Sequence, residues 1–266
     1  MAIDPSASVH PTAIVGVGAD IGRNCRIGPY CVIGSETALG EDVELKSHVV
    51  VTGRTSVGKA TRIWPFASIG HQPQDLKYKG ERTRLEIGER NMIREHVTMN
   101  PGTEGGGGVT RIGSDSLYMM GAHIGHDCTM GDRLVVANHT SVSGHATVED
   151  DVILGGQVGV HQFCRIGRGA MIGGKTGVIA DVIPFGMVTG NRGHLSGINV
   201  LGLKRRGVPK SEIAAIRGAY SDIFESEGTL QEKIEAAAGK YADSALVKEV
   251  VAFILNKSSR SLTVPE

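Results

Sequence analysis

The sequence predicts an all-β fold of stacked coils with parallel sheets, followed by a small C-terminal α-helical domain. Three observations lead to this prediction. A large aliphatic residue recurs every six positions from Ile3, a small residue follows it four positions later, and the repeat stops near Pro184, before apolar residues at helical spacing. We therefore divide the chain into a repeat domain (1–185), a glycine-rich connection (186–208) and a helical domain (209–266).

The six-residue repeat accounts for nearly all of the first domain. A period of six fits neither the 3.6 residues of a helical turn nor the two-residue alternation of an ordinary strand. It fits a chain that forms a short strand, turns a corner and repeats, so that three repeats close one triangular coil. The large residues form two long runs and one short middle section: Ile3, Val9, Val15, Ile21, Ile27, Ile33, Leu39, Leu45, Val51, Val57, Ile63 and Ile69; Ile87, Ile93 and Met99; and Ile112, Tyr118, Ile124, Met130, Val136, Val142, Val148, Leu154, Val160, Ile166, Ile172 and Val178.

The position four residues after the large one is nearly always small, and all four cysteines occupy it: Cys25, Cys31, Cys128 and Cys164. They show no CxxC spacing, and free cysteine packs as a small hydrophobe. We therefore predict buried packing groups rather than metal ligands, disulfides or reactive thiols. Glycine often follows the large residue directly, where we expect it to supply backbone freedom at a sharp turn.

Two polar or glycine-rich segments interrupt the repeat, HQPQDLKYKGERTR (71–84) and PGTEGGGGV (101–109). Neither continues the six-residue pattern, so we expect loops that project from the coils, where functional residues often lie. Beyond the repeat, apolar residues at helical spacing predict three helices, over 213–223, 229–240 and 244–257.

The overall composition excludes some classes of function. Lysine plus arginine (28) equals aspartate plus glutamate (28), which gives no general support for binding to nucleic acid or a membrane surface. The start, MAIDPSASVH, lacks the basic and apolar regions of a signal peptide. No apolar run approaches the roughly 18 residues of a membrane span. We expect a cytoplasmic protein without membrane insertion.

The segment GAHIGHDCTMG (121–131) gathers histidine and aspartate between glycines. Because one coil takes 18 residues, we expect His126 to stack with Gly144 and Gln162, and Asp127 to stack with His145. Neighbouring coils lie about 4.8 Å apart, so these side chains converge on one outer face of the prism.

The residues alone leave three interpretations of this face. In the first, hexapeptide turns simply tolerate solvated polar groups. Alternatively, His123, His126, His139 and His145 supply a metal site, which needs about three converging ligands. In the third interpretation His126 is a general base whose tautomer is held by a carboxylate partner, because imidazole can accept a proton near pH 7.

Several motifs together resemble one family, the bacterial UDP-N-acetylglucosamine acyltransferases among the hexapeptide-repeat acyltransferases. The resemblance runs along essentially the whole chain and is carried by QDLKYKGE (74–81), IREHVTM with PGT (93–103), AHIGHDCTMG (122–131), SGHATVED (143–150), VGVHQFCRIG (158–167) and GLKRRG (202–207). It implies a left-handed parallel β-helix and transfer of an R-3-hydroxyacyl group from acyl carrier protein to the 3-position of UDP-N-acetylglucosamine, the first step of lipid A synthesis. It also implies a homotrimer with active sites between subunits and no cofactor beyond the phosphopantetheine of the carrier protein.

The resemblance assigns roles to particular residues. His126 matches the general base, Asp127 the group that orients it, and the backbone N–H of Gly144 the oxyanion donor. Gly174 matches the position that limits acyl-chain length, and glycine there predicts a long chain of about 12 carbons or more. The substrate-binding positions match Asp75, Lys77, His123, His145, His161, Gln162, Asn199, Arg205 and Arg206. The basic segment around Arg205 would also suit acidic acyl carrier protein.

The sequence departs from the family pattern of sugar and uridine contacts at Asn100, Pro101, Arg192 and Leu201. The acceptor could accordingly carry a 3-amino group. Two enzymatic alternatives stay open, a related N-acyltransferase acting on a UDP-amino sugar and a zinc hydratase of the gamma carbonic anhydrase type. A non-catalytic scaffold is a third. The resemblance favours the O-acyltransferase, with no metal and no nucleic-acid partner.

Overall fold

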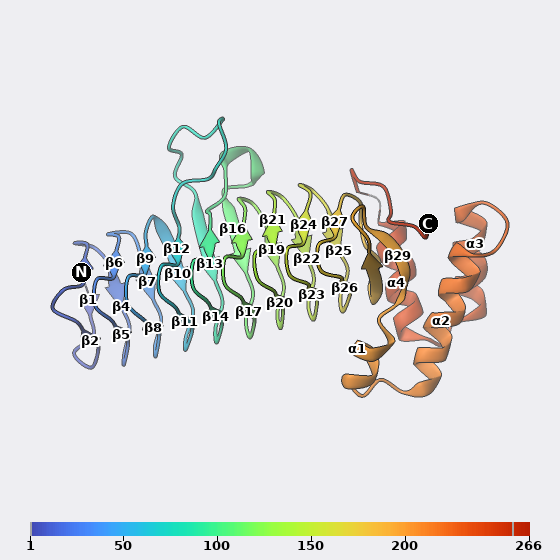
Figure 1. Ribbon diagram of the computed structural model, residues 1–266, viewed down its shortest axis with the longest axis horizontal. Helices are drawn as coiled ribbons and strands as arrows, with labels where there is room; N and C mark the ends of the chain where they lie inside the picture. The colour runs from blue at the N-terminus through green and yellow to red at the C-terminus, as the bar shows by residue number, and fades with distance from the viewer. Residues whose placement is uncertain (1, 257) are drawn as a thin grey trace.

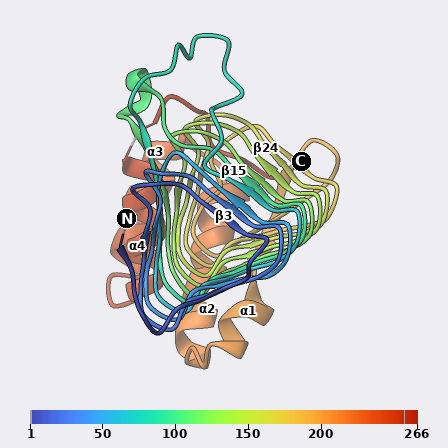
Figure 2. The same ribbon diagram turned by 90° about the vertical axis from the view of Figure 1, so that its left-hand side faces the viewer.

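The chain winds into a long prism of triangular cross-section, with helices packed at its C-terminal end (Figure 1 and Figure 2). The structure, a computed structural model, describes residues 2–256 and 258–266. Met1, in the predicted repeat domain, and Lys257, at the predicted end of the last helix, lie outside the described residues. Three sheets form the sides of the prism, and every pairing within the repeats is parallel, as the six-residue period predicts.

Each side of the prism is one sheet of short strands. Sheet A contains, in spatial order, β1 (Ala2–Ile3), β4 (Asp20–Ile21), β7 (Ala38–Leu39), β10 (Arg54–Val57), β13 (Arg84–Ile87), β16 (Val109–Ile112), β19 (Thr129–Met130), β22 (Thr147–Val148) and β25 (Arg165–Ile166). Sheet B contains β2 (Ser8–Val9), β5 (Arg26–Ile27), β8 (Glu44–Leu45), β11 (Arg62–Ile63), β14 (Met92–Ile93), β17 (Leu117–Tyr118), β20 (Val135–Val136), β23 (Ile153–Leu154), β26 (Met171–Ile172), β28 (Gly186–Thr189) and β29 (His194–Ile198). Sheet C contains β3 (Ile14–Val15), β6 (Val32–Ile33), β9 (Val50–Val51), β12 (Ser68–Ile69), β15 (Thr98–Met99), β18 (His123–Ile124), β21 (Ser141–Val142), β24 (Gly159–Val160) and β27 (Gly177–Val178).

The interior of the prism confirms the predicted packing. The large residue ends each short strand and points inward, as Ile124 and Val142 do, and the two pair in register 18 residues apart. The small position is also inside, and all four cysteines have an exposed fraction of 0%. Large and small side chains therefore alternate around each coil and fill the triangular core, in which Tyr118 takes one of the large positions.

Both predicted loops are insertions that leave the register intact. Val57 pairs with Ile87, thirty residues on instead of eighteen, and Ile87 pairs with Ile112, twenty-five residues on. The extra residues leave the prism as two loops on the same side (Figure 1 and Figure 2), and the second loop contains the short 3-10 helix η1 (Glu104–Gly106). The prism thus carries projecting segments without a shift in its columns.

The predicted role of the glycines that follow the large residues is confirmed at Gly70 (φ 84°) and was wrong at Gly125 and the other such glycines of the described coils. Gly125 does not adopt positive φ; a Cβ atom there would lie 2.9 Å from the nitrogen of Gly144 and 3.0 Å from the oxygen of Val142 in the next coil. Left-handed backbone falls two residues later, at Asp127 (φ 59°) and at His145 (φ 62°). Glycine is therefore needed because coils approach closely, and aspartate and histidine, which tolerate this conformation better than most residues, take the strained position.

The segment predicted as a glycine-rich connection contains regular structure. Strands β28 and β29 form an antiparallel hairpin that extends sheet B, and a short helix follows. Three further helices lie close to the predicted ranges. The helices are α1 (Val200–Arg205), α2 (Lys210–Phe224), α3 (Leu230–Lys240) and α4 (Ala245–Leu255). No helix in the described part of the chain is both long and apolar enough to cross a membrane.

Two arginines join the prism to the last helix. Arg168 forms a bidentate ion pair with Glu249 of α4 at 2.8 and 2.5 Å, and Arg165 lies over the ring of Phe253 at 4.4 Å. Arg165 also donates to the buried carboxylate of Asp181 at 2.8 Å. The polypeptide after α4 then returns to the prism, where Leu262 bridges to Asp181, so the C-terminal segment lies against the last coils.

Candidate active site

His126 and Asp127 form a hydrogen-bonded pair in the turn between β18 and β19. The distance between His126 Nδ1 and Asp127 Oδ2 is 2.8 Å. The imidazole side chain is 17% exposed, whereas the carboxylate side chain is 0% exposed. Because an ionised carboxylate only accepts hydrogen bonds, Nδ1 carries the proton and Nε2 keeps a free lone pair. This is the arrangement of a base and its orienting group.

The sequence placed Asp127 on an open outer face, and the structure corrects this. The second projecting loop covers the carboxylate, and Thr103 donates to both oxygens, from its backbone N–H to Oδ1 at 2.8 Å and from its hydroxyl to Oδ2 at 2.6 Å. A Cβ atom at Gly106 would lie 2.0 Å from the carboxylate carbon. The run of glycines therefore lets the loop backbone close over Asp127, while Thr103 supplies the polar contacts that a buried carboxylate requires.

Gly144 lies one coil beyond His126, as the 18-residue spacing predicts. A Cβ atom at Gly144 would lie 2.6 Å from Cε1 and 2.7 Å from Nε2 of His126, so only glycine lets the ring rest against this backbone. Within the described part of the chain, the N–H of Gly144 makes no hydrogen bond. The residue against which the free nitrogen of the imidazole rests therefore carries a backbone donor without an internal acceptor.

Two further histidines flank the pair. His145 packs edge-on against His126, with ring centroids 5.0 Å apart, and stacks at 4.4 Å on Phe163, one coil further along. Its Nδ1 lies 3.8 Å from Oδ2 of Asp127, which confirms the predicted stacking of these two residues. His123 is held through Nδ1 by the hydroxyl of Thr98 at 2.8 Å. Burial lowers the pKa of both His145 and His123 below the ordinary value, so both rings are neutral near pH 7.

The metal interpretation fits this geometry poorly. His126, Asp127 and His145 do offer ligand atoms within 4.8 Å of one another. Both oxygens of Asp127, however, already accept hydrogen bonds, and Nδ1 of His145 stays 3.8 Å from Oδ2. His139, which the four-histidine set would need, lies at a different corner, between sheets B and C. A cation would have to displace the bonds from Thr103 and His126, so the arrangement favours the hydrogen-bonded pair.

The first projecting loop carries Asp75 and Lys77, which form a local turn in which Asp75 Oδ1 accepts from the backbone N–H of Lys77 at 2.9 Å. The charges of both residues act on His145, although burial dominates the lowered pKa of that ring. The structure therefore brings the tip of this loop towards the histidine column.

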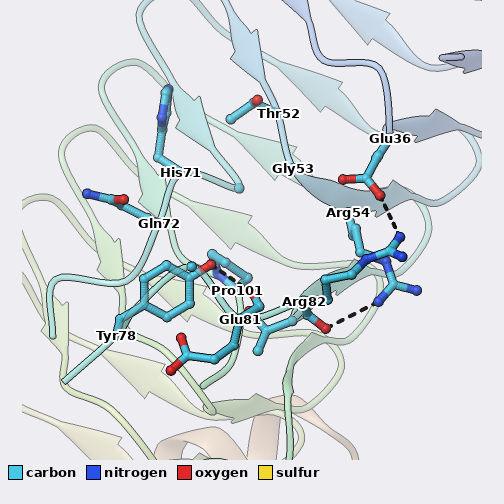
Figure 3. Close-up of a pocket in the computed structure, with 13 residues that line it drawn as sticks. Glu36, Thr52, Gly53, Arg54, His71, Gln72, Tyr78, Glu81, Arg82 and Pro101 are labelled. Carbon is cyan, nitrogen blue, oxygen red and sulfur yellow. Dashed lines mark hydrogen bonds and ion pairs between the residues drawn. The ribbon is translucent and has the colours of Figure 1, made fainter. Parts of the chain in front are cut away.

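A separate hollow of about 440 Å³ lies at the base of this loop (Figure 3). Two arginines hold the loop to the prism: Arg82 donates to Glu36 at 2.9 Å, and Arg54 donates to the carbonyl of Arg82 at 3.2 Å. Within the loop, Tyr78 donates to the carbonyl of Glu81 at 3.0 Å. None of the predicted site residues lines this hollow, so we assign it to loop anchoring.

His161 and Gln162 lie two coils beyond His126, next to a residue that the sequence did not single out. Arg260, from the returning C-terminal segment, reaches Nδ1 of His161 at 2.8 Å and the carbonyl of Gln162 at 3.0 Å. No repeat or motif pointed to this contact, because Arg260 lies 98 residues from Gln162 in the sequence.

The remaining predicted residues do not gather around His126 within one chain. Asn199 is buried at the start of α1, where its side chain accepts from Gly202 N and donates to the carbonyl of Gly169, both at 3.0 Å. Arg205 and Arg206 follow at the end of that helix. Gly174 is exposed at the corner between sheets B and C, whereas His126 lies at the corner between sheets C and A.

Comparison with known proteins gives consistent matches. Residues 181–263 match the family model described as UDP N-acetylglucosamine O-acyltransferase, domain 2, and residues 18–53 match that of the bacterial transferase hexapeptide. An acyl-[acyl-carrier-protein]–UDP-N-acetylglucosamine O-acyltransferase of Paracoccus denitrificans is 57% identical over 76% of this chain and 77% of its own length. One of the same name from Caulobacter vibrioides is 49% identical over 84% and 85%.

Solved structures agree along the whole length. The UDP-N-acetylglucosamine acyltransferase of Campylobacter jejuni is 32% identical, covers 97% of this chain and 100% of its own, and superposes with a TM-score of 0.92. The enzyme of Francisella novicida is 37% identical over 98% and 93%, with a TM-score of 0.87. Together with the hexapeptide match, these structures confirm the predicted left-handed parallel β-helix with its C-terminal helices.

Proposed function

Because the chain belongs to the UDP-N-acetylglucosamine O-acyltransferase family, we propose that it transfers an R-3-hydroxyacyl group from acyl carrier protein to the 3-hydroxyl of UDP-N-acetylglucosamine. The chain is thus an acyltransferase of lipid A synthesis. One observation carries the mechanism, the 2.8 Å hydrogen bond between Nδ1 of His126 and Asp127, which leaves Nε2 free beside the N–H of Gly144.

The reaction follows from these three groups. Nε2 of His126 takes the proton of the sugar hydroxyl while that oxygen attacks the thioester carbonyl carbon. The negative charge on the carbonyl oxygen is stabilised by the N–H of Gly144, a contribution of about 3 kcal/mol for a preorganised donor. When the C–S bond breaks, the imidazolium returns its proton to the phosphopantetheine sulfur. Asp127 stabilises the imidazolium and keeps the ring in one tautomer.

We assign the sugar, the nucleotide and the acyl chain of the two substrates to residues along the prism. Asp75, Lys77 and the neutral imidazoles of His123 and His145 position the sugar, and His161 and Gln162 extend this surface towards the helical domain. We assign the nucleotide to Arg205 and Arg206, since paired guanidinium groups suit a diphosphate. The amide of Asn199 is already bound to Gly202 and Gly169, so we give it the role of holding the start of α1, the helix that carries these arginines at its end. The acyl chain extends towards Gly174, whose lack of a side chain leaves room for a long chain. The reaction needs no metal or redox cofactor.

A homotrimer is part of the proposal. Gly174 and the arginines of α1 lie away from His126 in a single chain, so apposition of prisms would complete each site from neighbouring subunits. The basic residues Lys204, Arg205 and Arg206 are exposed on α1 and its end and offer a docking surface to acidic acyl carrier protein. We place the protein in the cytoplasm, where both substrates are soluble.

The test is an acyl-transfer assay on the purified chain with R-3-hydroxyacyl carrier protein and UDP-N-acetylglucosamine. We expect His126→Ala to lose activity, whereas His139→Ala, which removes an exposed histidine at another corner, keeps it. Substantial transfer by His126→Ala would refute the general base. Fragmentation of the product separates a 3-O-ester from an amide formed with a 3-amino sugar, and light scattering reports the trimer.

A further inference from the structure

The C-terminal segment returns to the prism and places a guanidinium beside the predicted substrate surface. After α4 the chain is fixed to the last coils by backbone bonds from Asp181 to Ser261 O (2.8 Å) and from Thr263 to Asp181 O (2.7 Å). The hydroxyl of Ser258 adds a bond of 2.6 Å to the buried carboxylate of Asp181. Arg260 lies inside this anchored stretch, so its position is set by the fold.

The contacts of Arg260 determine the state of one imidazole. Its Nη2 lies 2.8 Å from Nδ1 of His161, and its Nε lies 3.0 Å from the carbonyl oxygen of Gln162. A guanidinium only donates hydrogen bonds, so Nδ1 must be the acceptor and must carry no proton. A longer contact of 3.2 Å joins Nδ1 of His161 to the carbonyl oxygen of Gln162. If Nδ1 carried a proton to donate there, its N–H would face the donor N–H of Arg260. The carbonyl is in any case already bound by Nε of Arg260.

We propose that Arg260 is a positioning residue that holds His161 as the neutral tautomer with its proton on Nε2, so that this ring presents an N–H donor to an acceptor oxygen of the bound substrates. The assignment rests on the proposed function for the identity of those substrates, but the tautomer does not depend on it. His126 and His161 are then held in opposite tautomers, one by a carboxylate that accepts and one by a guanidinium that donates. The first ring accepts a proton, and the second donates a hydrogen bond two coils away.

The tautomer is measured directly by nitrogen NMR of the full-length protein with labelled histidine, and the spectrum of His161→Ala identifies the signals of this ring. In the wild type we expect an unprotonated Nδ1 and a protonated Nε2. In Arg260→Ala we expect a mixture of tautomers. A wild-type ring protonated on Nδ1, or a ring unchanged in Arg260→Ala, would overturn the proposal.

Kinetics test whether the guanidinium acts through the imidazole. Arg260→Ala should lower kcat/KM for UDP-N-acetylglucosamine about tenfold, as expected for one lost donor. In the background of His161→Ala the same change should cost less than twofold, because the partner is already absent. A loss under twofold in the wild-type background, or an equal loss in both backgrounds, would refute the positioning role. If the wild type transfers no acyl group to this acceptor, the proposed function fails, and the NMR comparison still decides the tautomer.

Discussion

Replacing Thr103 with valine tests whether the second projecting loop orients the hydrogen-bonded pair of His126 and Asp127. Valine has nearly the same shape as threonine but lacks the hydroxyl that donates to Oδ2 of Asp127 at 2.6 Å. The backbone N–H to Oδ1 at 2.8 Å is kept. The substitution therefore removes one charge-assisted bond from a carboxylate with an exposed fraction of 0% and keeps the shape of the side chain nearly unchanged.

Two independent estimates of the effect agree. A hydrogen bond to a charged group contributes about 1.5–3 kcal/mol, equivalent to roughly 10- to 150-fold in a rate when the bond acts in the transition state. A methyl carbon at the hydroxyl position would need about 3.3 Å from Oδ2, so the carboxylate must move by roughly 0.7 Å. Displacements of about 1 Å can cost a hundredfold, and this one acts directly on the partner of His126.

We expect kcat of Thr103→Val to fall by about 10- to 100-fold in the acyl-transfer assay. The matched control is Thr103→Ser, which keeps the hydroxyl and should stay within about threefold of the wild type. Both variants are compared by circular dichroism to confirm that they are folded at the assay temperature. Full activity in the folded valine variant, or an equal loss in the serine variant, would show that the loop does not orient Asp127.

Three further predictions concern other contacts. Gly144→Ala should reduce acyl transfer by at least about tenfold, because its Cβ would meet the ring of His126 at 2.6 Å; a rate near that of the wild type would contradict the close packing. Gly174→Met should shift acyl-chain preference to shorter chains in a competition assay, and an unchanged preference would refute the assigned ruler. Burial raises the pKa of Cys128 to about 12 and of Cys164 to about 11, so at pH 8 a thiol reagent should modify neither until denaturant is added. Rapid labelling of the native protein would contradict this.

The periodic part of the molecule could be predicted from the sequence because each hexapeptide has the same local task. Ile124 and Cys128 fill the core, and the 18-residue coil then fixes which outer residues meet, so the proximity of Asp127 and His145 followed from arithmetic. The role of Gly125 was missed because a requirement for space between coils and a requirement for positive φ select the same residue. Only the three-dimensional distances separate the two.

The aperiodic parts could not be predicted in this way. The loop around Thr103 has no repeat that could indicate its path, and its cover over Asp127 depends on the insertion folding back against the prism. The position of Arg260 depends on a return of the chain after the helix α4. In both cases the sequence showed a polar residue in a loop or tail, but the partner lay at a sequence distance that no local pattern encodes.

The periodic coils and the aperiodic segments contribute different features to the site. Parallel coils hold successive side chains of a column about 4.8 Å apart, a spacing set by backbone hydrogen bonds and therefore hard to change. His126 and Gly144 lie on this rigid part, as a base and an oxyanion donor must keep a fixed separation throughout the reaction.

The groups that set protonation, Thr103 through Asp127 and Arg260 through His161, come instead from an inserted loop and the C-terminal segment. Such segments can vary in length without a shift in register, as the unchanged pairing of Ile87 with Ile112 across the second insertion demonstrates. The proton positions can therefore be adjusted independently of the catalytic distances.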